Sequence, residues 1–336
     1  MAMTGGNTPP PTTFVINLDR SRDRWRMTKQ ECAREGVACT RFRAVDGSKL
    51  SARELGSRVT AQCRQLCTPS TIGCALSHMN VWDTVVAQNL GMAVVMEDDV
   101  RLVPGFSAKL RAVLADMPPD CDVMLLGCGG LCSSSTYSVQ EAYQKTLVSL
   151  TVPFLLRKYR KTTSAGPHRI FVPELFTGTH CYVVTQRGAR RLQGLHPRAW
   201  FHVDVAMASL HDLNIYATDP SLATQRADDS TIASFHFPMT LNAVLARVKT
   251  EKNGSLAYGW SVPMVRVAGV DVNLWLPTFA VLGLVPSLDP WVLALFLAEL
   301  VLGGPSANMA GCLAVWLLAR TKQCRRGGGG GGVRTK

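Results

Sequence analysis

Hydrophobic and polar residues alternate in blocks along the chain, and each block has the length of one strand or helix. Thr12–Leu18 is apolar and β-branched and predicts a first strand, after which the charged stretch Asp19–Arg26 predicts a loop and a helix start. Arg41–Val45 predicts a second short strand before the turn dipeptide Asp46-Gly47, and Ser51 is a suitable cap for a short helix. Polar chemistry therefore follows both strands directly.

A buried sheet is predicted by the next two apolar runs. Ile72–Val86 carries apolar residues at helical spacing, and the strand Met92–Met96 that follows shows no polar alternation. Pro104 suits the first position of a helix over Gly105–Asp116, and Asp122–Leu126 is a second uninterrupted apolar strand. Strands without alternation are typical of a sheet covered on both faces, so the pattern favours a doubly wound α/β domain.

The same alternation returns later in the chain. Cys181–Val184 and Ile215–Thr218 predict strands, and Gln186–Leu195 and the segment from Val203 to His211 predict helices. Between the two regular parts, residues 127–173 are rich in glycine, cysteine, serine and basic residues. We expect this stretch to be an insertion or a mobile loop.

From residue 272 onward the chain is apolar in three blocks, Leu274–Leu288, Trp291–Leu302 and Met309–Ala319. Each block is shorter than the ~20 residues of an unbroken membrane-spanning helix. They could form a hairpin or interfacial anchor, giving membrane association through residues 272–319, with the basic tail beyond them facing the cytosol. The alternative is a helical subdomain packed on the core.

These patterns predict four parts of the chain. Residues 1–13 form a disordered N-terminus, 14–245 the α/β domain, 246–320 the apolar C-terminal region and 321–336 a disordered basic tail that contains a glycine run. The first residues have no apolar core of a signal peptide, so we expect a cytoplasmic protein.

Composition limits the function classes. The chain is 47% hydrophobic and has 36 basic against 24 acidic residues, a net charge of +12, which suits phosphate-bearing ligands, anionic membranes or nucleic acid. Because no nucleic-acid-binding motif and no basic patch interleaved with aromatics is present, we expect no nucleic-acid partner. The 11 cysteines show no framework spacing, and neither Cys63-x-x-x-Cys67 with Cys74 nor Cys128 with Cys132 completes a zinc pattern, so we expect reduced, buried and inert thiols.

The acidic triplet Glu97-Asp98-Asp99 directly follows the buried strand Met92–Met96. Ligands of open α/β sheets bind outside the carboxyl ends of the strands. Three adjacent carboxylates repel one another, and a divalent cation such as Mg²⁺ or Mn²⁺ would offset that repulsion. Taken alone, an acidic triplet after a strand is more commonly a solvated acidic turn than a metal site.

An ordered set of short motifs decides between these interpretations. In chain order they are Phe14-Val-Ile-Asn-Leu-Asp-Arg20 with Asp23-Arg24, Phe42-Arg-Ala-Val-Asp-Gly47, Gly73-Cys-Ala-Leu-Ser-His78 with Trp82, Val94-Val-Met-Glu-Asp-Asp-Val100, Gly178-Thr-His-Cys-Tyr182 with Gly188-Ala189, His202-Val-Asp204, and Pro220-Ser-Leu-Ala-Thr-Gln225 with Ser230 and Ile232. Together these motifs resemble glycosyltransferase family 25, which includes lipooligosaccharide and procollagen galactosyltransferases.

The resemblance implies a GT-A-like fold, that is, a Rossmann-like, mostly parallel sheet flanked by helices, here with an apolar helical C-terminal extension. It implies a UDP-sugar donor, often UDP-galactose, a Mn²⁺ or Mg²⁺ cofactor, inversion at the anomeric carbon, and a glycan or glycoprotein acceptor. The metal ligands expected on this basis are Asp99 first, Asp98 second and Glu97 third.

Donor contacts are expected from the polar residues that follow the first strands. Asn17, Asp19, Arg20 and Arg24 could hold the uridine and its phosphates, because arginine presents forked donors to phosphate. Arg20 and Arg24 could instead pair with Asp23 and other acids. The further candidates each have a structural alternative, a turn former, a core polar group or a surface loop: Asp46, Ser77, His78 and Gln225.

Inversion needs a general base for the acceptor hydroxyl. Asp204 is the first candidate because it matches the late acid of the family pattern, and Glu174 is the second. The alternative to an active enzyme is a catalytically silent relative that binds carbohydrate or protein, since one fold hosts many functions.

Overall fold

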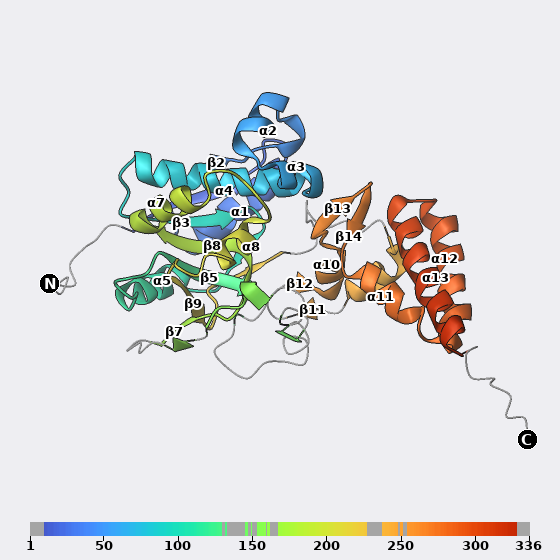
Figure 1. Ribbon diagram of the computed structural model, residues 1–336. Coiled ribbons are helices and arrows are strands. Elements are labelled where there is room, and N and C mark those ends of the chain that lie inside the picture. The colour runs from blue at the N-terminus through green and yellow to red at the C-terminus, as the bar shows by residue number, and fades with distance from the viewer. Residues whose placement is uncertain are drawn as a thin grey trace, which may run out of the picture. The chain divides into compact units, whose positions relative to one another are not determined.

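The protein is described here from a computed structural model, drawn in Figure 1. The structure describes residues 10–129, 132, 145–146, 149, 153–158, 160–161, 167–226, 237–247, 249–250 and 254–327. Most of the predicted insertion, Ser230, Ile232 and the glycine run lie outside these residues. The chain divides into two compact units, the first Met1–Arg64 with Pro69–Arg226 and the second Gln65–Thr68 with Ala227–Lys336.

The first unit alternates strands and helices, as the sequence predicts. Its described elements are β1 (Thr12–Asn17), α1 (Arg22–Arg34), β2 (Cys39–Arg43), η1 (Gly47–Lys49), α2 (Ala52–Arg58), α3 (Ala61–Leu66), α4 (Pro69–Ala87), β3 (Met92–Glu97), β4 (Val100–Leu102), α5 (Phe106–Ala115), β5 (Val123–Gly129), η2 (Pro153–Leu155), β6 (Arg160–Lys161), β7 (Arg169–Val172), β8 (Thr177–Thr185), α7 (Gln186–Leu195), α8 (Val203–Ala208), β9 (Ile215–Asp219) and β10 (Ala223–Gln225). Helix α5 begins one residue later than predicted, after Gly105 in a left-handed conformation.

One eight-stranded sheet organises this unit, in the order β2-β1-β3-β8-β5-β9-β7-β6. The pairs β1–β2, β1–β3 and β5–β9 are parallel, whereas β8 is antiparallel to both of its neighbours. Strand β7 is antiparallel to β9 and β6. Six strands therefore run in one direction, which confirms the predicted mixed α/β class with a mostly parallel sheet.

Strand pleating divides the core of this unit into two faces. Val94 and Met96 of β3 pack in one cluster with Cys32 of α1 and with Phe106 and Leu110 of α5. Because side chains alternate along a strand, Val95 and Glu97 point to the opposite face, the one that carries α4. All seven residues of β5 are buried, so the absence of polar alternation identified the interior strands correctly.

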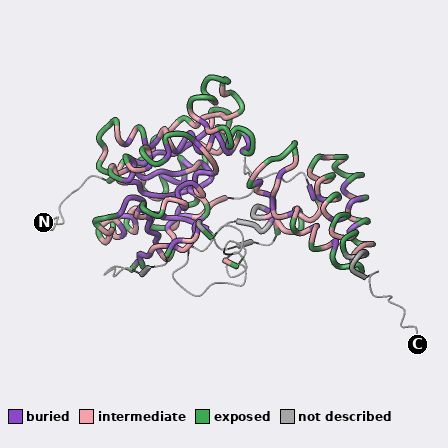
Figure 2. The backbone as a smooth tube through the Cα atoms, viewed as in Figure 1, coloured by how far each residue is buried: buried purple, intermediate pink, exposed green. Residues whose placement is uncertain are grey.

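The second unit has its own aromatic core, which Figure 2 shows as buried stretches within its helices. Its described elements are α9 (Met239–Leu245), β11 (Lys249–Thr250), β12 (Gly254–Ser255), α10 (Leu256–Ser261), β13 (Val265–Val267), β14 (Val270–Val272), α11 (Trp275–Leu282), η3 (Pro286–Leu288), α12 (Asp289–Gly303) and α13 (Ala307–Gly327). The buried core residues are Phe237, Trp275, Phe279, Val292, Phe296, Cys312 and Trp316. The three apolar blocks are thus helical, and α13 continues through residues 321–327.

Within the described residues, one helical segment, Pro286–Gly303, is long and apolar enough to cross a membrane, and 17% of it is buried.

The cysteine prediction was wrong at one place. Cys128 and Cys132 form a disulfide, with Cα atoms 6.0 Å apart. Composition and spacing alone do not show which cysteines come within bonding distance in the folded chain.

Candidate functional site

The acidic triplet lies at the carboxyl end of β3, and its three side chains do not converge on one point. Arg24, in the first turns of α1, reaches both Asp98 and Asp99 with one nitrogen, Nη2, 2.8 Å from a carboxylate oxygen of each. Glu97 points to the α4 face, as the pleat requires, and its Oε1 lies 3.6 Å from Nε2 of His78. The triplet is therefore split between two neighbouring environments.

Asp98 is held from three sides. Asn17, the last residue of β1, donates its Nδ2 to Asp98 Oδ2 at 2.6 Å, and Arg24 contacts the other oxygen. The Thr28 hydroxyl donates to the Asp98 backbone carbonyl at 2.7 Å. Asn17 in turn accepts a hydrogen bond from Arg41 Nε at 2.7 Å. The carboxylate of Asp98 thus joins β1, β3 and α1 and is fully engaged within the protein.

Asp99 differs because one of its oxygens has no partner. Its Oδ2 contacts Arg24 and accepts a hydrogen bond from Gln225 Nε2 at 3.2 Å, whereas Oδ1 is buried and unpaired. Burial and the negative charge of Glu97 raise the pKa of Asp99 to about 7. An unpaired buried carboxylate oxygen beside a second carboxylate is a position that a divalent cation would satisfy.

Gln225 reaches the triplet through a strand pair. β10 is antiparallel to β4, with Gln225 opposite Val100, and the Arg226 amide donates to the Asp99 carbonyl at 2.7 Å. Asp228 and Asp229, which follow Gln225 closely in the sequence, lie outside the described residues. The structure therefore brings Gln225 to the acidic triplet and not to a surface loop.

His78 is fully buried on α4 and belongs to a chain of hydrogen bonds. Its Nδ1 lies 2.9 Å from the hydroxyl of Tyr182, which also accepts a hydrogen bond from Trp82 Nε1 at 3.0 Å. Thr179 donates its hydroxyl to Glu97 Oε1 at 3.0 Å. Burial raises the pKa of Glu97, but the hydrogen bonds and charge of His78 outweigh it and hold that pKa below its usual range. Glu97 is thus kept as a carboxylate.

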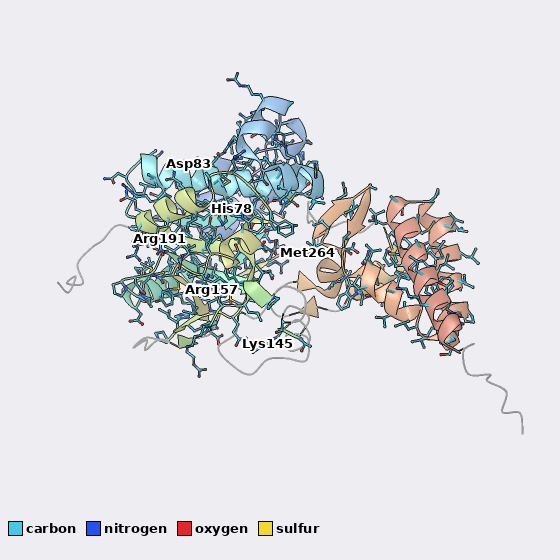
Figure 3. The ribbon with its side chains drawn as sticks, in the orientation of Figure 1. His78, Asp83, Lys145, Arg157, Arg191 and Met264 are labelled. Atoms are coloured by element: carbon cyan, nitrogen blue, oxygen red, sulfur yellow. A yellow bond between two sulfur atoms is a disulfide. The ribbon has the colours of Figure 1, made fainter. Side chains whose placement is uncertain are left out.

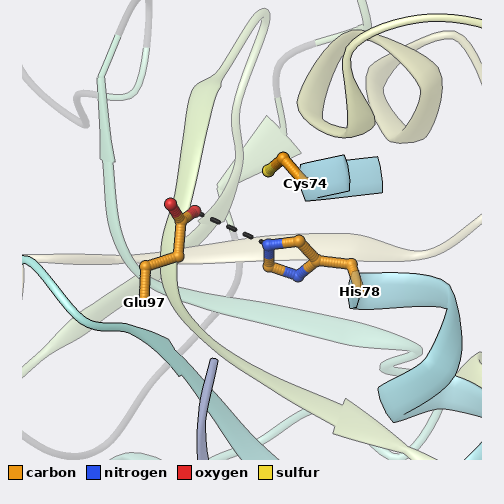
Figure 4. Close-up of side chains that lie close together, drawn as sticks. All are labelled: Cys74, His78 and Glu97. Carbon is orange, nitrogen blue, oxygen red and sulfur yellow. Dashed lines mark ion pairs between the residues drawn. The ribbon is translucent and has the colours of Figure 1, made fainter. Parts of the chain in front are cut away.

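Glu97 and His78 also belong to the one group of three metal-ligating side chains found within the described residues. The group is completed by Cys74, and the ligand atoms all lie within 4.8 Å of one another (Figure 4). The sequence analysis considered Cys74 only with Cys63 and Cys67 and rejected it as a metal ligand, and it quoted Thr179 and Tyr182 within motifs without giving them a role. The signal available was the spacing of Cys74 and His78, four residues apart on one helix face.

The other predicted donor residues form ion pairs with neighbouring side chains after strands β1 and β2. Asp19 accepts hydrogen bonds from Arg41 and Arg43, at 2.8 and 2.7 Å, and Arg20 forms an ion pair with Asp46. The hydrogen bond from Arg41 lowers the pKa of Asp19.

Asp46 also shapes its turn, because its Oδ1 accepts hydrogen bonds from the Ser48 amide and hydroxyl. The hydroxyl bond of Ser48 is the main cause of the lowered pKa of Asp46. Both roles considered for this residue, turn former and polar contact at the site edge, are thus compatible with its position.

Ser77 connects α4 to the loop after β2. Its hydroxyl accepts a hydrogen bond from the Val45 amide at 2.8 Å and donates to the Gly73 carbonyl at 2.6 Å. Gly47 and Gly73 allow this approach, since a Cβ on Gly47 would lie 1.8 Å from the Pro69 carbonyl oxygen. The structure thus gives Ser77 a packing role and does not bring it to the acidic triplet.

The two candidate bases differ in their surroundings. Asp204, in the first turn of α8, accepts the Gly178 amide on Oδ2 and the Val205 amide on Oδ1, both at 2.8 Å. Burial raises the pKa of the Cys74 thiol well above its usual value, and the negative charges of Glu97, Asp204 and Asp99 raise it further. Glu174 instead forms an ion pair with Lys145 at 2.7 Å. Figure 3 shows His78 and Lys145 well apart in this unit.

Comparison with known proteins gives the family. The model of glycosyltransferase family 25, described as an LPS biosynthesis protein family, matches residues 11–207, more than half of the chain. A glycosyltransferase 25 family member of Anopheles gambiae is 33% identical over 111 residues, which cover 31% of this chain and 19% of that protein.

Two vertebrate proteins give similar values. Procollagen galactosyltransferase 1 of Danio rerio is 31% identical over 34% of this chain and 21% of its own, and procollagen galactosyltransferase 2 of Mus musculus is 34% identical over 31% and 18%. The chain thus spans about a fifth of the length of these relatives. Among solved structures, mouse xyloside xylosyltransferase 1 aligns with a TM-score of 0.30 and 8% identity, over 60% of this chain and 80% of that one. On the strength of the family match, the chain belongs to glycosyltransferase family 25.

Proposed function

We propose that this protein is a metal-dependent, inverting glycosyltransferase that moves a sugar of the galactose class from a UDP-sugar to a hydroxyl of a glycan or glycoprotein. The observation that carries the proposal is the unpaired, buried Oδ1 of Asp99 beside the carboxylate of Glu97, at the carboxyl end of β3. Ligands of α/β sheets bind at this end. Two of the named vertebrate relatives are galactosyltransferases.

A divalent cation, Mn²⁺ or Mg²⁺, fits Asp99 and Glu97 better than it fits the whole triplet. Asp99 offers a free oxygen and Glu97 a carboxylate kept ionised, whereas Asp98 is occupied by Asn17 and Arg24. When bound, the cation would neutralise the diphosphate of the leaving UDP. Asp98 then acts by holding Arg24 and Asn17 in place.

Donor binding is assigned to the arginines and acids at the edge of the site. Arg20 is 54% exposed at its side chain, and its ion pair with Asp46 can open at small cost. Its guanidinium could then contact a phosphate with two parallel hydrogen bonds. Asp19 and Asp46 remain to accept hydrogen bonds from the ribose or the base, and Gln225 closes the opposite side over Asp99.

Asp204 is the proposed general base. Each of its oxygens accepts one backbone amide, which fixes the carboxylate and still leaves lone pairs for an acceptor hydroxyl. The base would remove the proton as the hydroxyl attacks the anomeric carbon from the side opposite the leaving UDP. Glu174 would first have to release Lys145, so it stays the second candidate.

The test is release of UDP from a panel of UDP-sugars, with and without Mn²⁺ or Mg²⁺, since hydrolysis needs no acceptor. We expect one sugar to be hydrolysed only with metal, and Asp99→Asn to lower that rate about 100-fold or more, the scale for losing one electrostatic contact to developing charge. Asp23→Asn is the matched control because the Asp23 side chain is 81% exposed. Undiminished, metal-independent hydrolysis in Asp99→Asn would contradict the mechanism.

A catalytically silent, carbohydrate- or protein-binding relative is the second candidate function. It is favoured by one observation, because Arg24 already compensates Asp98 and Asp99 without any metal. A flat result across the whole UDP-sugar panel, together with retained binding of a glycan, would support this candidate.

We also propose that the second unit associates with a membrane surface through residues 272–319. The buried residues of α12 are Val292, Phe296 and Glu299, yet its other face is apolar as well. The exposed side chains there include Leu297 at 64% and Val301 at 83%. An exposed apolar face of this kind marks a protein or membrane contact.

Glu299, the charged residue in the middle of α12, is buried, whereas the exposed side chains of this helix are apolar. Its carboxylate accepts hydrogen bonds from the amides of Met239 and Thr240, at 2.6 and 2.7 Å, and from the Thr240 hydroxyl at 2.5 Å. The charge therefore belongs to the interior of the unit, and the outward face of α12 keeps none. Arg320 of α13 pairs with Asp289 at 2.6 Å, whereas the exposed Lys322 could contact anionic headgroups.

A further inference from the structure

The cluster of Cys74, His78 and Glu97 has the geometry of a small metal site. Cys74 and His78 project from the same face of α4, four residues apart, and Glu97 faces them from the end of β3 (Figure 4). The ligand atoms lie within 4.8 Å of one another, and His78 Nε2 is 3.6 Å from Glu97 Oε1. Two ligands about 2.0–2.3 Å from a tetrahedral zinc ion lie roughly 3.3–3.8 Å apart, so only a small contraction is needed.

The second observation is that the far side of His78 is fixed. Nδ1 lies 2.9 Å from the Tyr182 hydroxyl, and Trp82 Nε1 donates to the same hydroxyl at 3.0 Å. The rings of His78 and Tyr182 are also stacked, with centroids 5.7 Å apart. Metal-ligating histidines typically have their second nitrogen held in this way, because it fixes ring orientation and tautomer. Nε2 is left directed at Glu97 Oε1, 3.6 Å away, with the Thr179 hydroxyl 3.5 Å from it.

The local charge also favours a cation. The carboxylates of Glu97, Asp204 and Asp99 all place negative charge near the Cys74 thiol. A metal that binds here would displace the thiol proton to solvent and form a metal–sulfur bond. One thiolate and one carboxylate then balance the two positive charges of the ion.

The exposed parts of Cys74 and Glu97 offer an ion access to the cluster. His78 is fully buried, whereas Cys74 is half-buried and the Glu97 side chain is 20% exposed. The accessible side leaves a fourth position for water or another oxygen ligand. A mixed sulfur, nitrogen and oxygen donor set suits Zn²⁺, whereas Mg²⁺ prefers oxygen ligands alone.

From these observations we propose that Cys74, His78 and Glu97 bind a thiophilic divalent cation of the Zn²⁺ class. This site does not depend on the proposed transferase activity, although it shares Glu97 with it. Zn²⁺ bound by Cys74 and His78 would hold Glu97 on the α4 face and so compete with binding of Mn²⁺ or Mg²⁺ between Glu97 and Asp99.

Cobalt(II) substitution tests the proposal without any activity assay. We expect the full chain, kept reduced with a non-thiol reductant, to bind one Co²⁺ with a thiolate-to-cobalt charge-transfer absorption that Zn²⁺ abolishes. Cys74→Ser should remove this absorption and weaken Zn²⁺ at least about 100-fold, more than the 10–100-fold typical of losing an outer partner, the effect expected for Tyr182→Phe. Cys39→Ser, which changes another half-buried thiol, and Asp99→Asn should both keep the absorption.

Alkylation of the unmodified chain gives a readout that needs no variant. Zn²⁺ should slow alkylation of Cys74, measured by peptide mass spectrometry, while Cys39 reacts at an unchanged rate. The proposal is overturned if Co²⁺ gives no thiolate absorption, if the absorption persists in Cys74→Ser, or if Zn²⁺ leaves Cys74 as reactive as before. None of these results bears on UDP-sugar hydrolysis, so failure here and failure of the proposed function are distinguishable.

Discussion

At the scale of single residues, Arg24 controls the electrostatics of the candidate site. It is the one cation within 4.0 Å of Asp98 or Asp99 in the part of the chain that the structure describes, and its side chain is only 15% exposed. Arg26 on the same helix instead pairs with Asp23, with both side chains largely in solvent. Helix α1 therefore carries one largely buried and one exposed arginine, each in an ion pair, so that Arg26 can serve as the control for Arg24.

We expect Arg24→Ala to lower the free energy of unfolding of the protein by about 3 kcal/mol at neutral pH, because it leaves two buried carboxylates without their cation. Arg26→Ala should change it by less than about 0.5 kcal/mol. The penalty of Arg24→Ala should shrink as the pH falls, because protonation of the carboxyls removes the uncompensated charge. Urea unfolding followed by circular dichroism at several pH values measures both effects, and equal losses in the two variants would contradict this account of Arg24.

His196 provides a second residue-scale prediction, for pH. Its Nε2 lies 3.0 Å from the Ala206 carbonyl and its Nδ1 accepts a hydrogen bond from Trp200 Nε1 at 3.0 Å, an arrangement of the neutral ring. Burial lowers the pKa of His196 from 6.5. The unfolded chain then binds more protons, so the free energy of unfolding should fall as the pH drops through about 6.5. His196→Gln should flatten this decrease between about pH 7 and 5.5, and an unchanged slope would exclude His196 as its source.

At the scale of elements, sequence periodicity predicted most strands and helices of the first unit and the location of the acidic triplet. It could not predict that β8 would lie antiparallel between β3 and β5, since the three strands read alike as apolar runs. That placement brings Tyr182 and Thr179 to His78 and Glu97. The divergence of the triplet follows from the pleat of β3, but assigning α4 and α1 to opposite faces required the three-dimensional arrangement.

Two glycines in α7 test how helix α7 packs on the sheet. A Cβ on Gly188 would lie 2.1 Å from the backbone oxygen of Asp122, whereas a Cβ on Gly194 would meet nothing within 4 Å. We expect Gly188→Ala to lower the free energy of unfolding by about 1–3 kcal/mol, because backbone must move. Gly194→Ala should be neutral or raise it by up to about 1 kcal/mol through helix propensity. Thermal unfolding of the two variants decides, and a tolerated Gly188→Ala would mean that α7 packs less closely than observed.

At the scale of the whole molecule, the chain combines a family 25 unit with a helical unit that buries only part of its apolar side chains. The family match ends at residue 207 and the motif resemblance at residue 232. Helices α11, α12 and α13 lie beyond both, so neither gives information about their function. Sequence alone left an anchor and a packed subdomain as alternatives for this region. The structure contains features of both, a buried aromatic core and an exposed apolar face on the same helix α12.

Vesicle flotation of the full chain tests whether lipid covers this face. Burying one Leu or Val side chain contributes about 1.5–3 kcal/mol, so the double variant Leu297→Gln, Val301→Gln should weaken binding to anionic phospholipid vesicles at least about 100-fold. Both side chains are exposed and uncharged after the change, so the aromatic core and the net charge stay as they are. Val267→Gln, at a residue 50% exposed on β13, is the matched control and should bind like the unmodified chain. If the unmodified chain stays in solution as a dimer that the double variant dissociates, a second copy and not lipid covers α12, because removal of the same apolar area would then cost self-association.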